Sequence, residues 1–313
     1  MKTLKQYFRT LLAVFLALGA VLASNTGAAA QADNTARDKI VISGASGQLG
    51  GLVVRELLAR GIPASDLILV SRTPEKLEEF KKLGAATRFG DFTKPKSLPT
   101  AYAGGTKLLL ISIGFDAGPR PEAHKRAVDA AVAAGVKHIV YTSFVALSKG
   151  DRTGLATDHY QTEEIIKQSG VAWTMLRNSI YANILVPQAA KMIADGKATV
   201  SDSDFRIGYV TREDCAAAAA AALATSGHEN KVYDITGPEL IGSREIAAAA
   251  SALTGKHIEL VTAEPNAPPA RRGFGGPTYE VVSDDFAKLT GRPATSVREF
   301  FEAQRDVFLG IKK

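Results

Sequence analysis

Three glycines at every third position interrupt the segment KIVISGASGQLGGLVVRELL, residues 39–58. The β-branched run before them is typical of a buried strand, and the apolar residues after them recur at helical spacing. Gly44 ends the strand, Gly47 lets the backbone approach a bound pyrophosphate, and Gly50 lets the helix pack against the sheet. The segment therefore predicts the first βα unit of a parallel sheet, with a helix N-terminus suited to phosphates.

Short apolar runs alternate with helical patterns from residue 39 to about residue 181. The expected strands are Ile40–Ser43, Leu67–Ser71, Thr87–Phe89, Lys107–Ile113, His138–Thr142 and Ala172–Arg177. The expected helices are Leu49–Arg60, Pro74–Leu83, Pro121–Ala134 and Asp158–Gln168. Such alternation is typical of repeated βαβ units, so we predict an α/β fold with a Rossmann-type doubly wound parallel sheet.

The pattern changes after residue 181, and residues 182–313 are expected to form a small C-terminal α/β lobe on the substrate side. Its expected elements are a helix at Arg212–Ala224, a strand in KVYDIT, a helix from Ser243, a strand at Ile258–Val261 and helices near Ser283–Leu289 and Ser296–Phe308. Residues 264–279 are too rich in Pro and Gly for regular structure. This segment carries Arg271, Arg272 and Phe274, and it is expected to be either a solvated loop or a lid over bound ligands.

Residues 1–32 have the composition of a secretory signal peptide. Three basic residues precede an apolar run from Leu11 to Ala23, which is short for a membrane span, and Ala30-Gln31-Ala32 matches a cleavage site. The basic head holds no Arg-Arg pair, which favours export before folding. We expect the leader to insert in the membrane during export and the protein, with residues 33–38 as a linker, to be periplasmic or secreted. A membrane-anchored or cytoplasmic protein is the alternative if the leader is not used.

Charge and cysteine content exclude several classes of function. The formal charge of +6 falls to +3 without the leader's three basic residues, and no Lys/Arg-rich tract is present, which argues against nucleic-acid binding. Cys215 is the single cysteine, so an internal disulfide and a cysteine-rich metal site are excluded. The four histidines His124, His138, His228 and His257 show no metal-ligand spacing, so we expect no metal and read them as surface or packing residues.

The glycine turn predicts a dinucleotide site, and residues 39–181 are therefore expected to be an NAD(P)-binding Rossmann domain. Backbone N–H groups at Gln48, Leu49 and Gly50 open the helix, and the side chains of Ser46 and Gln48 add donors. The second strand ends in Ser71-Arg72 with no acid, whereas sites that prefer NADH carry Asp or Glu there. Because Arg72 can pair with a 2′-phosphate, NADPH is expected as the cofactor over NADH.

Other candidate contacts follow the ends of neighbouring strands, because ligands bind at the carboxyl ends of parallel strands. Asp91 comes just after the third expected strand, where it borders the expected adenine. Ser112 and Gly114 end the fourth strand, beside the expected nicotinamide ribose. Asn178 and Tyr181 follow the sixth strand and are expected to line the substrate pocket.

The segments ISGASGQLG, SRTPEKL, LLLIS, AAVAAGVKHIVYTS, DHYQTEEIIKQSGVAWTMLRNSIYANIL and VYDITGPE occur in this order. Together they resemble the NmrA-like atypical short-chain dehydrogenases/reductases, most closely the type 2 NADPH:quinone oxidoreductases, over essentially all of residues 39–313. The most specific part is residues 158–185, with an H-x-x-TE…SG…LRN…Y pattern. The resemblance implies a Rossmann domain with a small C-terminal lobe and NADPH-dependent two-electron reduction of quinones. The leader is not part of the family pattern.

The sequence lacks the Tyr-x-x-x-Lys pair of ordinary short-chain reductases, since Tyr141, Tyr160 and Tyr181 have no lysine four residues later. Hydride transfer to an electron-poor ring stacked on the nicotinamide does not need that pair. His159 is the candidate catalytic donor to a quinone oxygen, expected where a loop enters the helix that Asp158 would cap. In isoflavone-reductase-like relatives a catalytic lysine falls at this position. A purely structural histidine is the alternative.

Two functions fit these observations. One is an NAD(P)H-dependent oxidoreductase that reduces a small-molecule quinone by direct hydride transfer, with Phe144 as an apolar wall of the pocket. The other is a non-catalytic, redox-sensing NADP-binding regulator of the NmrA type. Export conflicts with the use of NADPH, because a chain threaded out unfolded cannot carry a non-covalent cofactor. A homo-oligomer is compatible with the sequence.

Overall fold

The computed structural model describes residues 38–114, 118–200, 205–263 and 277–310. The compact unit that holds them begins at Asp38. The predicted signal peptide and the loop with Arg271, Arg272 and Phe274 lie outside the described residues. Among the helices of the described ranges, none is both long and apolar enough to span a lipid bilayer.

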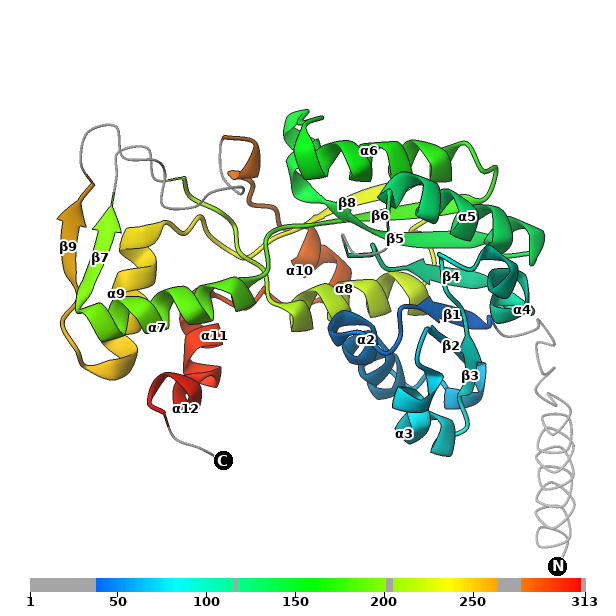
Figure 1. The fold of residues 1–313 in the computed structure, drawn as a ribbon, viewed down its shortest axis with the longest axis horizontal. Helices are drawn as coiled ribbons and strands as arrows, with labels where there is room; N and C mark the ends of the chain where they lie inside the picture. Colours follow the sequence, from blue (N-terminus) through cyan, green and yellow to red (C-terminus); the bar gives the residue numbers. More distant parts are fainter. Residues whose placement is uncertain (1–37, 115–117, 201–204, 264–276, 311–313) are drawn as a thin grey trace, which may run out of the picture. The chain divides into compact units, whose positions relative to one another are not determined.

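Parallel strands of the described residues form a seven-stranded sheet in the order β3-β2-β1-β4-β5-β6-β8 (Figure 1). Their bounds are β1 Ile40–Ser43, β2 Leu67–Ser71, β3 Ala86–Phe89, β4 Lys107–Leu110, β5 His138–Phe144, β6 Ala172–Asn178 and β8 Lys231–Ile235. The predicted doubly wound sheet is confirmed. The strand order reverses between β1 and β4, which is where ligands bind in sheets of this type.

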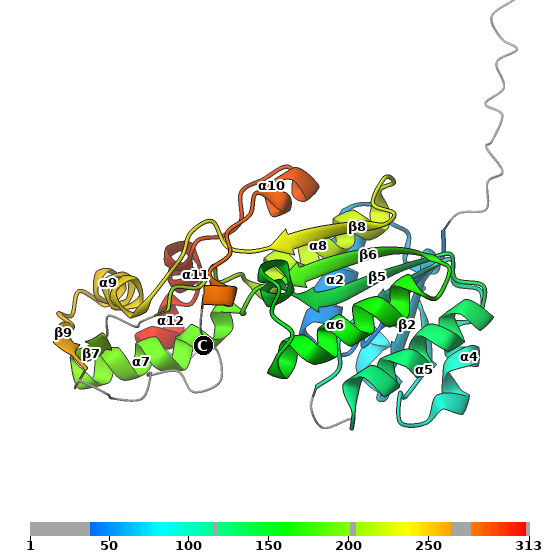
Figure 2. The ribbon, with the colours of Figure 1, turned by 90° about the horizontal axis from the view of Figure 1, so that it is seen from above.

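Helices cover both faces of this sheet, as Figures 1 and 2 show. One face carries α2 (Gln48–Ala59), α8 (Arg212–Ala224) and α10 (Asp285–Thr290). The other face carries α4 (Leu98–Tyr102), α5 (Arg120–Ala133) and α6 (Gly154–Lys167). Successive strand residues alternate between the two apolar cores, so that Ile40 and Ile42 face α2 and α8 while Val41 faces α4 and α5.

Helix α8 is almost entirely buried, from Cys215 through its run of seven alanines to Leu223. It packs against α2, the helix that follows the glycine turn. Because each alanine contributes only a methyl group, the two helices can approach closely over the sheet. The Ala-rich tract is therefore a packed helix, as the sequence predicts.

The C-terminal lobe has its own apolar core, built by α7, α9 and α11 together with residues from the strand ends. The elements of the lobe are α7 (Leu185–Asp195), β7 (Lys197–Val200), α9 (Ser243–Thr254), β9 (Glu259–Thr262), α11 (Val297–Ala303) and α12 (Arg305–Phe308). Strands β7 and β9 pair in parallel, and neither α7 nor β7 was predicted. Arg292, just after α10, pairs through its guanidinium with the fully buried Asp214 of α8 at 2.7 Å. This ion pair fixes the segment after α10 to α8.

Candidate active site

The glycine turn lies at the carboxyl end of β1. Gly44 has a φ of +95°, in the region that favours glycine, and its N–H donates to the Val70 carbonyl oxygen at 3.0 Å. A Cβ on Gly50 would lie 2.2 Å from the Gly44 carbonyl oxygen. Only glycine therefore allows α2 to begin this close to the turn, and the predicted roles of Gly44 and Gly50 fit the geometry.

Helix α2 opens directly onto this turn, with Gly47 as its N-cap residue. Helix geometry leaves the N–H groups of Gln48, Leu49 and Gly50 without an intrahelical acceptor, which is the arrangement that binds phosphate. The side chain of Leu49 is buried in the core, so only its backbone can reach a ligand. Gly47 and Gln48 are exposed at the helix start.

Two adjoining cavities of about 480 and 410 Å³ lie beside the turn and share Ser46, Gly47 and Lys76 in their walls. The larger one brings together predicted residues from four strand ends, namely Gly44, Ser46, Gly47, Arg72, Asp91, Ser112 and Gly114. The smaller one is lined by Gln48 and, across from it, by Asn183 and Arg212. Together the cavities form a cleft at the carboxyl edge of the sheet, where the switch in strand order lies.

The end of β2 presents hydroxyls and cations to this cleft. The Ser46 and Ser71 hydroxyl oxygens lie 2.6 Å apart, and the Thr73 N–H donates to Ser71 Oγ at 2.9 Å. Arg72 and Lys76 line the same wall, and residues 67–73 contain no acid. The sequence analysis missed Lys76, although its place four residues after Arg72 at the start of the next helical turn was a usable signal.

Asp91 also lines the larger cavity. Burial raises the pKa of Asp91, but the hydrogen bonds from Thr93 and the charges of Arg72 and Lys94 outweigh that effect and hold it below its usual value. The carboxylate is thus charged at neutral pH. It lies within the electrostatic reach of Arg72, the residue predicted to select the cofactor.

The fourth strand is shorter than predicted, since β4 ends at Leu110 and residues 111–114 form a loop along the cleft. The backbone groups of this loop bond to side chains instead of continuing the strand ladder. The Ser112 N–H, for example, donates to Thr142 Oγ1 at 2.8 Å. Ser112 and Gly114 keep their predicted place beside the cleft, on this loop and not on a strand.

The predicted position of His159 was wrong in one respect: it lies inside α6, not at the helix start. Helix α6 begins at Gly154 with Thr153 as N-cap, so Asp158 is an interior residue and does not cap it. The Asp151 carboxylate holds this helix start by accepting from the N–H and hydroxyl of Thr153, both at 2.8 Å. Sequence alone favoured Asp158 because aspartate is a frequent cap.

His159 is buried between Tyr141 and Phe144. Its Nδ1 lies 2.9 Å from Tyr141 Oη, and its ring centroid lies 5.6 Å from that of Phe144. Burial, together with the nearby Arg120 charge, lowers the pKa of His159 to about 3. The imidazole is therefore neutral at neutral pH and offers one N–H.

Asn178 is the last residue of β6 and is 4% exposed. Among the described residues, its Oδ1 atom and the neighbouring Ser179 Oγ have no hydrogen-bond partner although both are buried. Such groups are rare in folded proteins, and a ligand's polar group is one way to satisfy them. Tyr181 follows, and the Arg212 guanidinium lies 5.3 Å from its ring centroid. The structure thus places Tyr181 beside Arg212, which lines the smaller cavity. The linings of the two cavities do not include the predicted substrate-side residues Phe144, His159, Asn178 and Tyr181.

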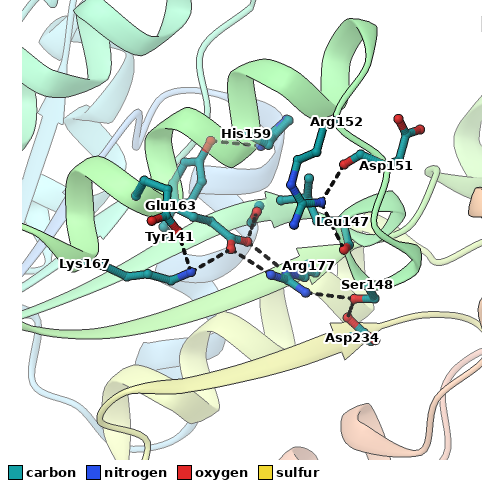
Figure 3. A network of polar contacts seen from close by, with 12 residues as sticks. Tyr141, Leu147, Ser148, Asp151, Arg152, His159, Glu163, Lys167, Arg177 and Asp234 are labelled. Atoms are coloured by element: carbon teal, nitrogen blue, oxygen red, sulfur yellow. Dashed lines mark hydrogen bonds and ion pairs between the residues drawn. The ribbon is translucent and has the colours of Figure 1, made fainter.

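A buried ion pair joins Glu163 of α6 to Arg177 of β6, beside His159 and Tyr141 (Figure 3). Arg177 Nε and Nη2 donate to the two oxygens of Glu163 at 2.9 and 2.8 Å, and Ser143 donates to the same carboxylate at 2.6 Å. Burial raises the pKa of Glu163, but the hydrogen bonds from Arg177 and Ser143 outweigh this effect and hold the pKa below its usual value. Both members of the pair are therefore charged. Arg177 also donates to Ser148, which ties the helical turn after β5 to β6.

The chain is similar in sequence to proteins that bind NAD(P)H. A family model described as NAD(P)H-binding matches residues 44–226, more than half of the chain. Quinone oxidoreductase 2 of Escherichia coli is 36% identical over 219 residues, which cover 70% of this chain and 76% of that protein. An NmrA-like family domain-containing oxidoreductase of Aspergillus flavus is 29% identical over 233 residues, 73% of this chain and 75% of that protein.

Solved structures show the same architecture. The NADPH-dependent quinone oxidoreductase of Escherichia coli in complex with NADPH superposes with a TM-score of 0.74 at 30% identity, covering 85% of this chain and 99% of that one. The triphenylmethane reductase of a Citrobacter species complexed with NADP(H) gives a TM-score of 0.74 at 31% identity with the same coverage. The resemblance read from the sequence motifs is confirmed.

Proposed function

The chain belongs to the NAD(P)H-binding family and is an NAD(P)H-dependent oxidoreductase, and from this premise we propose that it uses NADPH to reduce a quinone. The observation that carries the cofactor choice is the wall at the end of β2, where Arg72 and Lys76 line the cleft and residues 67–73 contain no acid. Two cations favour a 2′-phosphate, and an acid there would repel it.

The residues of the cleft fit a dinucleotide. Because Gly50 has no Cβ, α2 can begin directly against the glycine turn, and the N-terminus of α2 presents donors to a pyrophosphate. When bound, NADPH supplies the hydride. This chain positions the cofactor and the acceptor against each other, and such positioning supplies most of the rate when the acceptor ring is already electron-poor.

On the acceptor side, we place Phe144, Asn178 and Tyr181 around the ring. His159, neutral and with Nδ1 bound to Tyr141, presents Nε2–H as a donor for a quinone oxygen if Tyr141 donates to Nδ1. Reduction to the hydroquinone takes one hydride and one proton, and that proton comes from water. The related triphenylmethane reductase supports an acceptor panel that includes extended dyes.

Titration of residues 33–313 with NADPH and NADH, followed by nicotinamide fluorescence, tests the cofactor. We expect tighter binding of NADPH, and Arg72→Ala to weaken NADPH by about tenfold while leaving NADH little changed. Arg298→Ala, an exposed arginine of the lobe, is the matched control. Consumption of NADPH on addition of a quinone then separates an enzyme from a regulator that only binds the dinucleotide. Absence of binding for both nucleotides overturns the assignment.

We also propose that residues 1–32 direct export, on the strength of their basic head, apolar run and Ala30-Gln31-Ala32 site. A fusion of residues 1–38 to a reporter that is active only outside the cytoplasm tests this. Activity comparable to that of an established export signal is expected. A silent reporter that is nonetheless made at full length contradicts export and leaves a cytoplasmic or anchored protein.

A further inference from the structure

His124 and Arg120 together bind both backbone polar groups of one residue of the cleft wall, Ile113. The Ile113 N–H donates to His124 Nε2 at 3.2 Å, and Arg120 Nε donates to the Ile113 carbonyl oxygen at 2.9 Å. Both side chains come from the first turns of α5 and are buried, His124 completely. Ile113 lies on the loop 111–114 that lines the larger cavity.

The hydrogen bonds of His124 have only one possible direction. Because Nε2 accepts from Ile113, the ring proton is on Nδ1, which donates to Thr162 Oγ1 at 2.9 Å. Thr162 in turn donates its hydroxyl proton to the Asp158 carbonyl oxygen inside α6, at 2.8 Å. The chain of bonds runs from the cleft loop through α5 to α6, and it specifies one tautomer of a neutral imidazole.

A packing histidine does not need two directed bonds to two different elements. The loop 111–114 has no ladder partners after β4 ends, so the bonds from His124, Arg120 and Thr142 fix its path. We propose that His124 is a positioning residue, which sets the Ile113 peptide and with it the wall that faces the nicotinamide ribose. This proposal rests on the proposed function, since it assigns His124 to the cofactor site.

Two substitutions each remove one of the two hydrogen bonds of the His124 ring and can keep the other. In His124→Gln the side-chain amide ends at the distance of Nε2, so its oxygen can accept from Ile113 while the contact with Thr162 is lost. In His124→Asn the amide ends at the distance of Nδ1, so it can reach Thr162 and leaves the Ile113 N–H without an acceptor. His257→Asn makes the same change at an exposed histidine of the lobe and serves as control.

We expect His124→Asn to weaken NADPH binding about tenfold and to speed hydrogen exchange at the Ile113 amide. His124→Gln should stay within about threefold of the unchanged protein in NADPH affinity. A purely structural role predicts instead that both variants lower Tm alike and change NADPH affinity alike, and that result overturns the proposal. If His124→Asn does not fold, His124→Leu takes its place, because it also leaves the Ile113 N–H without an acceptor, and an NADPH affinity equal to that of His124→Gln overturns the proposal too.

The readouts also distinguish this inference from the proposed function. A wild-type protein that does not bind NADPH contradicts the function. In that case the exchange rate of the Ile113 amide still decides the positioning role, because it is measured without cofactor. Equal exchange rates in His124→Asn and His124→Gln contradict the role.

Discussion

The ring of Tyr279 packs edge-on against Phe144, with centroids 5.4 Å apart and an interplanar angle of 71°. Tyr279 belongs to the C-terminal lobe, in the short turn Pro277–Tyr279, and Phe144 ends β5. The neighbouring Thr278 donates to the Asp151 carboxylate at 3.1 Å. A lobe segment is thereby fixed over the strand end where the substrate is expected, with Phe144 between it and His159.

Because Tyr279 supports Phe144 but lies away from the glycine turn, we expect Tyr279→Ala to raise KM for a quinone by about tenfold. The Kd for NADPH should change by less than twofold. Tyr279→Phe, which keeps the ring, should behave like the unchanged protein, and Val307→Ala is an exposed control in the same lobe. Steady-state kinetics with both substrates varied gives these values. An equal loss in quinone KM and NADPH Kd would contradict a role confined to the acceptor side.

Adjacent glycines at the start of α2 should respond in opposite ways to alanine. Gly50→Ala places a Cβ 2.2 Å from the Gly44 carbonyl oxygen, so we expect a loss of several kcal/mol in the free energy of unfolding and loss of NADPH binding. In Gly51→Ala the new Cβ meets the far end of the Arg55 side chain at 3.4 Å and the Ala45 carbonyl oxygen at 3.8 Å, which is an ordinary contact distance. This variant should be neutral or stabilise by up to about 1 kcal/mol, because alanine favours helix. Urea denaturation and nucleotide titration of both variants check this.

The buried ion pair of Glu163 and Arg177 should matter far more than an exposed one. Glu163→Gln keeps the side-chain volume but leaves the Arg177 charge without its partner, so we expect a loss of about 3 kcal/mol. Glu302→Gln, in the exposed pair with Arg305, should cost less than about 0.5 kcal/mol. The pKa of Glu163 is lower in the folded protein than in the unfolded chain, so its contribution is present above about pH 4.3 and is lost as pH falls further. The free energies of unfolding of Glu163→Gln and of the unchanged protein should therefore converge in strong acid, and urea denaturation at several pH values measures them.

Two buried neutral histidines predict a second dependence on pH. Burial and then the Arg120 charge lower the pKa of His124 and of His159 to about 3, whereas the unfolded chain titrates near 6.5. Between these values the unfolded state binds protons that the folded state cannot, so stability falls as pH drops from about 6.5, by roughly 1.4 kcal/mol per pH unit and histidine. His124→Gln should flatten the slope by about one proton. Urea denaturation at several pH values measures the slope, and an unchanged slope in His124→Gln contradicts the prediction.

The sheet and the cofactor wall were predictable because their signals are local. Apolar runs of four to seven residues give the strands, and the spacing of Gly44, Gly47 and Gly50 depends on backbone sterics in one turn. Arg72 could be placed beside the cleft, since the sequence puts it directly after a strand whose carboxyl end borders the ligand site in sheets of this type, and its contact with the cofactor stays a prediction.

Other parts depend on contacts between distant segments, which no local pattern carries. The start of α6 at Gly154 is held by Asp151, itself bound by Thr278 from the far end of the chain. The end of β4 depends on side chains of α5 and β5 that capture its last amides. His124 was read as a surface or packing residue because only the fold brings Ile113 and Thr162 to its two nitrogens.

The alanines of α8 have a consequence beyond packing. The helix begins at Arg212, which lines the smaller cavity, and its body lies against α2, which carries the glycine turn. The side-chain volume along α8 thus sets the spacing between the two cavity walls. Enlarging one methyl group, for instance by Ala219→Val, would shift those walls without altering a residue that touches the ligand. Ligand affinity at the smaller cavity is therefore expected to depend on buried positions that do not touch the ligand.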